Sequence, residues 1–201
     1  SDNLMDQTPI LSLKGVTKRY SGKAGTSEVL GGIDLDIREG EFVAILGFSG
    51  AGKTTLISAI AGLIEADEGE ILLRGLPIDG PSRDRGLVFQ SYSLFPWLNV
   101  EANVALAVDA VHKDKTAAQR AALVKQKVEL VGLGHALDRK PSELSGGMRQ
   151  RVAVARALVG EPSILLADEP TGNLDSKTST EIMALFDALH RAGQTVVLVT
   201  H

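Results

Sequence analysis

Gly47-Phe48-Ser49-Gly50-Ala51-Gly52-Lys53-Thr54-Thr55 is the stretch that decides the fold, because it matches the phosphate-loop pattern G-x-x-x-x-G-K-[ST] in a fitting context. The apolar run Glu41–Leu46 before it is typical of a buried strand, and apolar residues at helical spacing follow from Leu56 to Ile64. Such a loop can cradle a phosphate, since its backbone N–H groups and the helix N-terminus direct positive charge at one anion. A glycine-rich turn without a ligand is the alternative, which the lysine and both flanking elements disfavour.

Lys53 and Thr54 carry the chemistry of this loop. In a nucleotide-binding phosphate loop the lysine reaches the β- and γ-phosphates, and the hydroxyl that follows it ligates Mg²⁺. We therefore expect ATP to lie along Gly47–Thr55, with Lys53 on its phosphates and Thr54 on the metal.

An acidic pair follows the apolar strand Ser163–Ala167. Asp168 and Glu169 come directly after it, and the C-terminal end of such a strand is where a phosphate-loop enzyme holds its metal. We expect Asp168 to bind Mg²⁺, directly or through water, and Glu169 to polarise the attacking water. An acidic turn is the alternative, but it explains less here because Mg·ATP needs a carboxylate.

The composition limits the other possibilities. The chain has 201 residues, of which 44% are hydrophobic and 23% are charged, which suits one globular domain or a core with an embedded subdomain. Its net charge of −4 gives no electrostatic case for binding nucleic acid. Cysteine is absent, which excludes a disulfide framework and thiol catalysis. No apolar run reaches about 18 residues and the N-terminus lacks a signal-peptide pattern, so we expect a soluble or peripheral protein.

The rest of the pattern predicts an α/β fold with a parallel sheet. The alternating segments Ile10–Tyr20 and Val29–Ile37 predict an antiparallel, one-faced sheet, with a flexible turn at Ser21–Ser27. Buried strands then alternate with helices, which implies right-handed crossovers. The further elements expected are strands at Gly69–Gly75, Leu87–Phe89, Ser163–Ala167 and Thr195–Thr200 and an amphipathic helix at Thr178–Ala192.

A helical insert interrupts this pattern. From Val100 to about Leu137 the composition is rich in Ala, Leu, Val, Lys and Gln, with apolar residues at helical spacing. We therefore divide the chain into an ATP-binding core, residues 1–91 plus 155–201, and an α-helical subdomain, residues 92–154. The core includes the antiparallel β subdomain, and we expect its C-terminal part to be missing.

Leu144-Ser145-Gly146-Gly147-Met148-Arg149-Gln150 resembles the signature motif of ATP-binding-cassette (ABC) transporters, and the resemblance covers essentially the whole chain. Ser145-Gly146-Gly147 opens a predicted helix from Met148 to Leu158, which makes a second anion-binding helix start. The resemblance implies a phosphate-loop NTPase core and a head-to-tail dimer, in which this motif closes on ATP held by the Lys53 loop of the other subunit. A glycine-rich helix cap is the alternative.

The resemblance also assigns single positions. Gln90 matches a glutamine that contacts the metal and the attacking water, although a lone glutamine is usually a polar surface residue. His201 matches a switch histidine that touches the γ-phosphate, and Tyr20 matches an aromatic residue that stacks on adenine. Asn173-Leu174-Asp175 matches a loop that contacts the partner subunit, an ordinary helix cap being the alternative. The implied catalytic residues are Glu169, His201 and Gln90, and the implied metal ligands are Thr54, Gln90 and Asp168.

Two parts of the chain resemble different transporter groups. The segments Gly80-Pro81, Asp84–Gln90, Phe95–Leu98 and Leu144–Arg151 resemble the ATPases that import nitrate, taurine, sulfonates and related anions. The region 164–201, above all Ala167–Ser176, looks more like the lipoprotein-release and macrolide-efflux group. Import is favoured, because the segment after Gln90 faces the membrane subunit in the family.

The implied partners are a second ATP-binding subunit, transmembrane permease subunits and, for an importer, an extracytoplasmic solute-binding protein, with no nucleic acid. The implied location is the cytoplasmic face of the inner membrane, as a peripheral protein. Phe95 and Trp97 are expected either to face the permease or to pack inside the insert. Family members continue past His201, so we expect a truncated chain. The rivals are a non-transport ABC ATPase acting on DNA and a small-molecule kinase.

Overall fold

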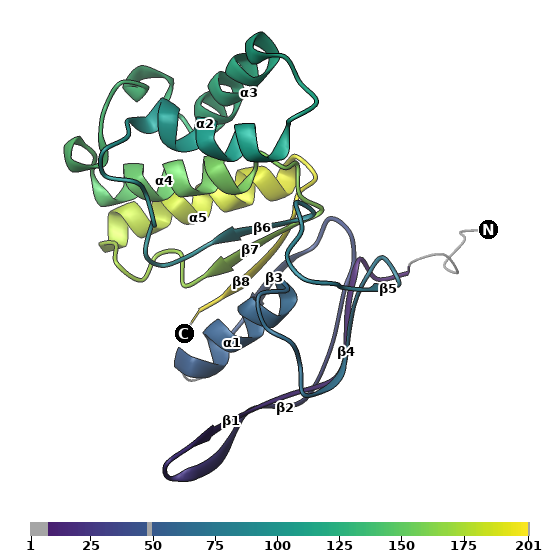
Figure 1. The fold of residues 1–201 in the computed structure, drawn as a ribbon. Coiled ribbons are helices and arrows are strands. Elements are labelled where there is room, and N and C mark those ends of the chain that lie inside the picture. The colour runs from purple at the N-terminus through teal and green to yellow at the C-terminus, as the bar shows by residue number, and fades with distance from the viewer. Residues whose placement is uncertain (1–7, 48–49, 201) are drawn as a thin grey trace.

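The computed structural model describes residues 8–47 and 50–200, which form an antiparallel sheet, a parallel sheet and a layer of helices (Figure 1). The strand order is β2-β1-β4-β5 in the antiparallel sheet and β3-β8-β7-β6 in the parallel sheet. The strands are β1 (Leu11–Gly22), β2 (Gly25–Ile37), β3 (Phe42–Ile45), β4 (Glu68–Leu73), β5 (Leu76–Pro77), β6 (Arg85–Val88), β7 (Ile164–Asp168) and β8 (Thr195–Val199). The helices are α1 (Gly50–Ile60), α2 (Val100–Val111), α3 (Ala117–Leu130), α4 (Gly146–Ala157) and α5 (Ser176–Arg191), with short 3-10 turns η1 (Gly134–Ala136) and η2 (Pro141–Glu143). The predicted α/β class, with a parallel sheet and an N-terminal antiparallel sheet, is confirmed.

Strands β7 and β8 are the centre of the molecule, since every residue in both is buried. Their side chains alternate between two apolar cores, as the two-residue period of a strand requires. Leu165 and Leu198 belong to the core shared with α4 and α5, whereas Leu166 and Val197 belong to the core shared with α1. Both faces of the parallel sheet are therefore covered, which explains why these strands are continuous apolar runs.

Helix α1 lies between the two sheets (Figure 1). Its apolar residues Leu56, Ile57 and Ile60 are buried in one core with β7, β8 and the inner residues of β1, β2 and β4. The helix that follows the phosphate loop is thus fixed from both sides, which holds its N-terminus at the edge of the parallel sheet.

Helices α2 to α5 cover the other face of the parallel sheet (Figure 1). Apolar residues of all four helices join Val88, Leu165 and Val196 in a single core. Helix α4 also approaches the sheet backbone closely, since a Cβ at Gly86 in β6 would lie 2.4 Å from the carbonyl oxygen of Ala157. The helical layer is therefore packed directly on the strands that carry the candidate site.

Two local predictions were wrong. The turn at Ser21–Ser27 is shorter than expected, because β1 continues to Gly22 and β2 begins at Gly25, with these two residues paired. Strand β3 was expected to be buried but is half-buried, with Ala44 exposed. In the described part of the chain β3 is an edge strand of the parallel sheet, so one side of it lacks a neighbour.

The helical segment also differs in its limits. The expected helical stretch from Val100 to about Leu137 is divided into α2 and α3 by residues 112–116, where Thr116 forms a capping box with Gln119 at the start of α3. Helix α4 begins at Gly146 rather than Met148 and ends at Ala157. The expected boundary at 154/155 falls inside α4, so the division into 1–91 plus 155–201 and 92–154 stays a prediction. Within the described ranges, no helix combines the length and the apolar character that crossing a membrane would need.

Candidate functional site

The phosphate loop connects β3 to α1. Gly47 has a φ of +90°, a backbone conformation that side chains disfavour, and helix α1 begins at Gly50. Phe48 and Ser49, which were expected to contact ATP, lie outside the described residues. In the first turns of the helix Gly52, Lys53 and Thr55 are buried and Thr54 is exposed.

The acidic pair and the phosphate loop come together, as their places at the ends of parallel strands predict. The ammonium nitrogen Nζ of Lys53 lies 2.6 Å from Oε1 of Glu169. The hydroxyl of Thr54 donates a hydrogen bond of 3.0 Å to Oδ2 of Asp168. Two residues of the loop thus contact two consecutive residues at the end of β7, more than a hundred positions away in the sequence.

Burial raises the pKa of the Asp168 carboxyl, because the charged form loses solvation. The hydrogen bond from Thr54 opposes this shift, and the neighbouring charge of Glu169 adds to it. A carboxylate that is desolvated beside a second carboxylate is a favourable place for a cation.

The donor set fits Mg²⁺. The Thr54 hydroxyl and the Asp168 carboxylate supply two hard oxygen atoms next to each other, and Mg²⁺ in nucleotide sites uses few protein ligands beside phosphates and waters. No cluster of three or more His, Cys, Asp or Glu side chains within residues 8–47 and 50–200 is placed to hold a metal ion alone. At such a place the phosphates of a nucleotide and waters would complete the ligands of Mg²⁺.

Glu169 has an unusual backbone. Its φ is +44°, in the left-handed region that non-glycine residues rarely adopt. Its N–H donates to the carbonyl oxygen of Val199 at 2.8 Å, and its own carbonyl accepts from the N–H of Gly172 at 3.0 Å. The turn therefore leaves β7 sharply, and the Glu169 side chain reaches Lys53 across the end of the sheet.

Gln90 lies against the loop that follows Glu169. Its Nε2 donates to Oδ1 of Asn173 at 3.1 Å, and Nδ2 of Asn173 donates to the carbonyl of Gln90 at 3.4 Å. Gly172 lies close beside them, because an added Cβ would lie 2.6 Å from Nε2 of Gln90 and this side chain would have to shift. The structure thus brings two predicted site segments together through a contact that was not predicted. The predicted contacts of Gln90 with the metal and of Asn173 with the partner subunit stay predictions.

Asp175 is the N-cap of α5. Its Oδ1 accepts a hydrogen bond of 2.8 Å from the N–H of Thr178, and this bond lowers the pKa of the Asp175 carboxyl. The helix-cap alternative is therefore present in the structure. Its neighbour Leu174 is half-buried, and the predicted contacts of this loop with a partner subunit stay a prediction.

The signature-like segment forms the start of α4. Leu144 is buried, and the exposed Ser145 is the N-cap, with its hydroxyl accepting from the N–H of Met148 at 3.2 Å. A Cβ at Gly146 would lie 3.1 Å from the Leu174 side chain, and one at Gly147 only 2.4 Å from Cγ2 of Thr178. Gly147 therefore lets α4 lie directly against the first turn of α5.

Of the two remaining predicted residues, only Tyr20 is among the described ones. Tyr20 is in β1 near the hairpin end, where it is 44% exposed and Nζ of Lys18 lies 5.5 Å from the ring centroid. An exposed ring is compatible with stacking on a base, but no contact in the described residues tests this. His201 lies outside the described residues.

The sequence did not reveal two polar side chains, one buried and one half-buried, that bind backbone groups of residues 92–98. Asn103 in α2 is 1% exposed, accepts from the N–H of Phe95 at 2.8 Å and donates to the carbonyl of Leu98 at 3.0 Å. Arg156 in α4 donates to the carbonyls of Tyr92 at 2.9 Å and Ser93 at 2.7 Å. Both are polar residues at positions where the helix otherwise faces apolar neighbours, and that interruption is the signal that could have found them.

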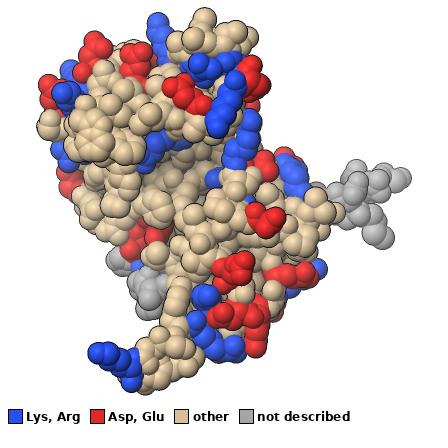
Figure 2. Space-filling view, in the orientation of Figure 1, with Lys and Arg blue, Asp and Glu red and all other residues tan. Residues whose placement is uncertain are grey.

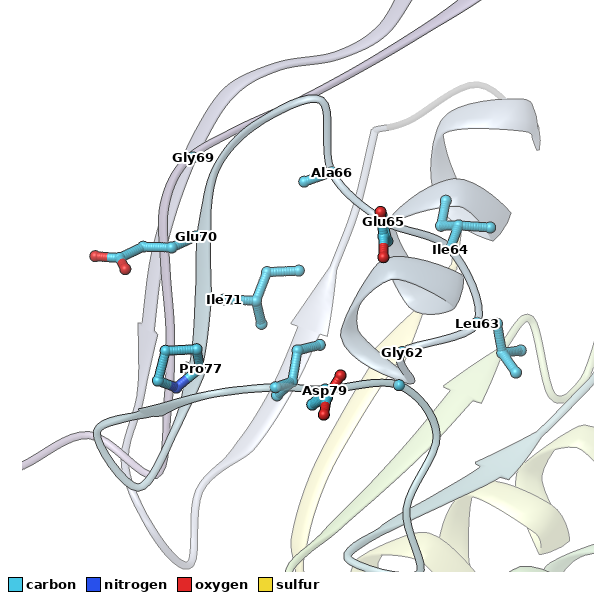
Figure 3. A pocket seen from close by; sticks show the side chains of 12 residues that line it. Gly62, Leu63, Ile64, Glu65, Ala66, Gly69, Glu70, Ile71, Pro77 and Asp79 are labelled. Carbon is cyan, nitrogen blue, oxygen red and sulfur yellow. The ribbon is translucent and has the colours of Figure 1, made fainter.

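A separate pocket lies between the end of α1 and strands β4 and β5 (Figure 3). It has a volume of about 500 Å³, and the described residues that line it include Glu65, Glu70 and Asp79 but no lysine or arginine. An acidic lining repels phosphates, so this pocket is not the nucleotide site.

The model of the protein family described as "ABC transporter" matches residues 30–172. This chain belongs to the ABC transporter family. The predicted family is thereby confirmed, and the Lys53–Glu169 and Thr54–Asp168 contacts belong to an ABC cassette. ATP-binding cassettes of this family hydrolyse ATP.

The similar proteins include proteins of bicarbonate and nitrate transport. The chain is 46% identical over 193 residues to the bicarbonate transport ATP-binding protein CmpC of Synechococcus elongatus, covering 95% of this chain and 29% of that protein. It is 41% identical over 195 residues to the nitrate transport protein NasD of Klebsiella oxytoca, covering 96% and 74%. The chain thus spans under a third of CmpC.

A solved structure of the same fold is the dimeric ATP-binding cassette MJ0796 in a post-hydrolysis state bound to ADP and Pi. It has a TM-score of 0.82 and 38% identity, with 95% of this chain and 88% of that chain covered. The bicarbonate and nitrate proteins agree with the resemblance of Asp84–Gln90 to importer ATPases. The resemblance of Ala167–Ser176 to the lipoprotein-release group stays a prediction.

Proposed function

We propose that this chain is the ATP-hydrolysing subunit of an ABC transporter that imports a small anion of the nitrate or bicarbonate type. The observation that carries the proposal is the pairing of Lys53 with Glu169 and of Thr54 with Asp168 at the end of the parallel sheet. The nitrate and bicarbonate relatives support this class of solute. Taurine and other sulfonates, which the sequence also suggested, are less directly supported.

In the proposed mechanism, ATP enters between Lys53 and Glu169. The β- and γ-phosphates take the place of the Glu169 carboxylate on the ammonium group of Lys53. Glu169 is then released to accept a proton from the attacking water, and Gln90 helps to orient that water. Mg²⁺, held by Thr54 and Asp168 and contacted by Gln90, would neutralise charge on the phosphates when bound. His201 would contact the γ-phosphate, Tyr20 the adenine, and the backbone of Gly47–Thr55 the phosphates.

We further propose that the nucleotide site is completed by a second subunit. Ser145 is exposed at the N-terminus of α4, a place where backbone N–H groups favour an anion. In a head-to-tail dimer, Leu144–Arg149 of one subunit would close on ATP held by Lys53 of the other, and Asn173–Asp175 would line the contact. The dimeric state of the MJ0796 cassette supports this arrangement.

The permease is proposed to dock beside the loop that follows Gln90. Phe95 and Trp97 are 40% and 67% exposed, with ring centroids 5.4 Å apart, which favours a partner contact over the alternative of packing inside the insert. The proposed location is the cytoplasmic face of the inner membrane, with a solute-binding protein as a further partner. On the face shown in Figure 2, basic and acidic side chains are mixed, which agrees with a function that needs no nucleic acid.

Co-purification tests this proposal. The full-length protein, tagged and extracted from membranes, should retain a multi-spanning permease, and nitrate or bicarbonate with the solute-binding protein should stimulate its ATP hydrolysis. Stimulation by DNA, with no membrane partner, would instead support a non-transport ABC ATPase. A permease of the lipoprotein-release or macrolide-efflux type, which the resemblance of Ala167–Ser176 favours, would redirect the proposal to export.

A further inference from the structure

Gln150 in α4 connects two segments of the candidate site. Its side chain is 0% exposed. Its amide nitrogen Nε2 donates to the carbonyl oxygen of Pro170 at 2.7 Å and to that of Phe89 at 3.1 Å. A single buried amide group of α4 therefore holds the backbone just after β6 and the backbone just after β7.

The orientation of this amide is determined by its surroundings. If Oε1 and Nε2 were exchanged, an oxygen atom would face the two carbonyl oxygens of Phe89 and Pro170, which is repulsive. In the observed orientation Oε1 is buried and finds no hydrogen-bond donor among residues 8–47 and 50–200. The observed orientation is therefore the one in which both carbonyl oxygens receive a donor.

The two anchored carbonyls belong to the neighbours of the proposed catalytic residues. Phe89 directly precedes Gln90, and Pro170 directly follows Glu169. The left-handed φ of +44° at Glu169 persists only where the surrounding structure restrains it. The hydrogen bond from Glu169 N–H to Val199 restrains one side of this turn, and the bond from Gln150 to Pro170 restrains the other.

A second side chain of α4 strengthens the connection to the segment after β6. Arg156 binds the carbonyls of Tyr92 and Ser93 at 2.9 and 2.7 Å. Residues 89–93 are thus attached to α4 near both of their ends. A displacement of α4 would carry this segment, and Gln90 in it, along with the helix.

We propose that Gln150 is a positioning residue for ATP hydrolysis, which sets Gln90 and Glu169 relative to each other and to the signature helix. The proposal rests on the proposed roles of Gln90 and Glu169 in hydrolysis. It gives Gln150 a role within its own subunit, whereas the motif resemblance assigned it to the nucleotide of the partner. A side chain that is fully buried between two backbone carbonyls transmits the position of α4 rather than touching ATP.

The test compares Gln150→Met, which keeps the length of the side chain but has no N–H donor, with the wild-type full-length protein. We expect kcat for ATP hydrolysis to fall about 10- to 100-fold, since small misplacements of reacting groups cost this much. The Kd for ATP, measured without hydrolysis in EDTA, should stay at the wild-type value, because among the described residues Gln150 donates to Phe89 and Pro170. The unfolding midpoint should fall, because the carbonyl oxygens of Phe89 and Pro170 lose their donor, so kcat is measured well below the midpoint of the variant.

Gln150→Asn is the second variant, because it keeps a neutral amide but is one methylene shorter and cannot reach both carbonyls. If the methionine variant does not fold, the asparagine variant takes its place, with the same expected fall in kcat and retained ATP binding. The matched control is Gln126→Met on the exposed face of α3, which should leave kcat unchanged. A folded Gln150→Met variant with the wild-type kcat overturns the inference. A variant whose lower rate is explained by weaker ATP binding together with lower stability overturns it as well. Absence of hydrolysis by the wild type would instead refute the proposed function.

Discussion

Replacement of Gly147 by alanine tests whether α4 must lie directly against α5 within one subunit. The added Cβ would lie 2.4 Å from Cγ2 of Thr178, whereas carbon atoms in contact are normally about 3.5–4.0 Å apart. Either the Thr178 side chain must rotate away or the helices must separate locally by about 1 Å or more. Overpacking of this kind costs about 1–3 kcal/mol, and the higher helix propensity of alanine offsets up to about 1 kcal/mol, so we expect a net loss of about 1–2 kcal/mol.

Thr178→Ser provides the matching change, because serine lacks the Cγ2 atom that the new Cβ would meet. The double variant Gly147→Ala/Thr178→Ser should regain most of the lost free energy of unfolding, measured by urea denaturation. Gly22→Ala is the control, since a Cβ there meets no atom within 4 Å. A Gly147→Ala variant as stable as the wild type, or a double variant no more stable than the single one, would refute the packing argument. If the double variant regains its stability but does not hydrolyse ATP, Gly147 also contributes directly to the nucleotide site.

Three further variants test other parts of the site. Glu169→Gln should lower kcat about 10²- to 10⁴-fold by removing the proposed base. ATP binding, measured by equilibrium dialysis, should be retained because Lys53 no longer has to exchange a carboxylate for phosphate. An unchanged rate would exclude Glu169 as the base. Asn103→Leu should lower the free energy of unfolding by about 2–4 kcal/mol through lost buried hydrogen bonds. It should also alter the fluorescence of Trp97, because Asn103 holds the loop that contains this residue. Unchanged stability and emission would contradict this role of Asn103. Asp175→Ala should destabilise α5 at neutral pH. Because the folded-state pKa of Asp175 is lowered, its contribution to stability is present above the unfolded pKa and is lost as the pH falls through the folded pKa. The free energies of unfolding of wild type and variant, measured by urea titration, should therefore converge in acid. A difference that stays constant with pH would exclude the charged cap.

The parts of the site that could be predicted from the sequence are those fixed by the ends of strands. The uninterrupted apolar run before Asp168 required a strand buried on both faces, and parallel strands place their carboxyl ends at one edge. The contacts of Lys53 with Glu169 and of Thr54 with Asp168 follow from that geometry. The sequence also indicated a helix start near Ser145, which is a favoured cap residue, but it placed the first helical residue at Met148 rather than Gly146.

The contacts between elements could not be predicted, because they depend on how closely two backbones approach. Nothing in the sequence pairs Gly147 with Thr178, and nothing marks Gln150 as the residue that binds both Phe89 and Pro170. The half-exposed state of β3 is a similar case, since an apolar run looks the same in a central strand and in an edge strand. Such features are properties of the packed structure rather than of local pattern.

Mixing two inactive variants of the full-length protein tests the central claim, that each ATP site is shared between two subunits. Lys53→Ala removes the phosphate contact, and Ser145→Arg blocks the start of α4; each variant alone should be inactive. In a head-to-tail dimer a mixed pair has one site with both defects and one intact site, so an equal mixture should recover about a quarter of the wild-type rate of ATP hydrolysis. A mixture as inactive as its components, or a Ser145→Arg variant with the full wild-type rate, would contradict the shared site.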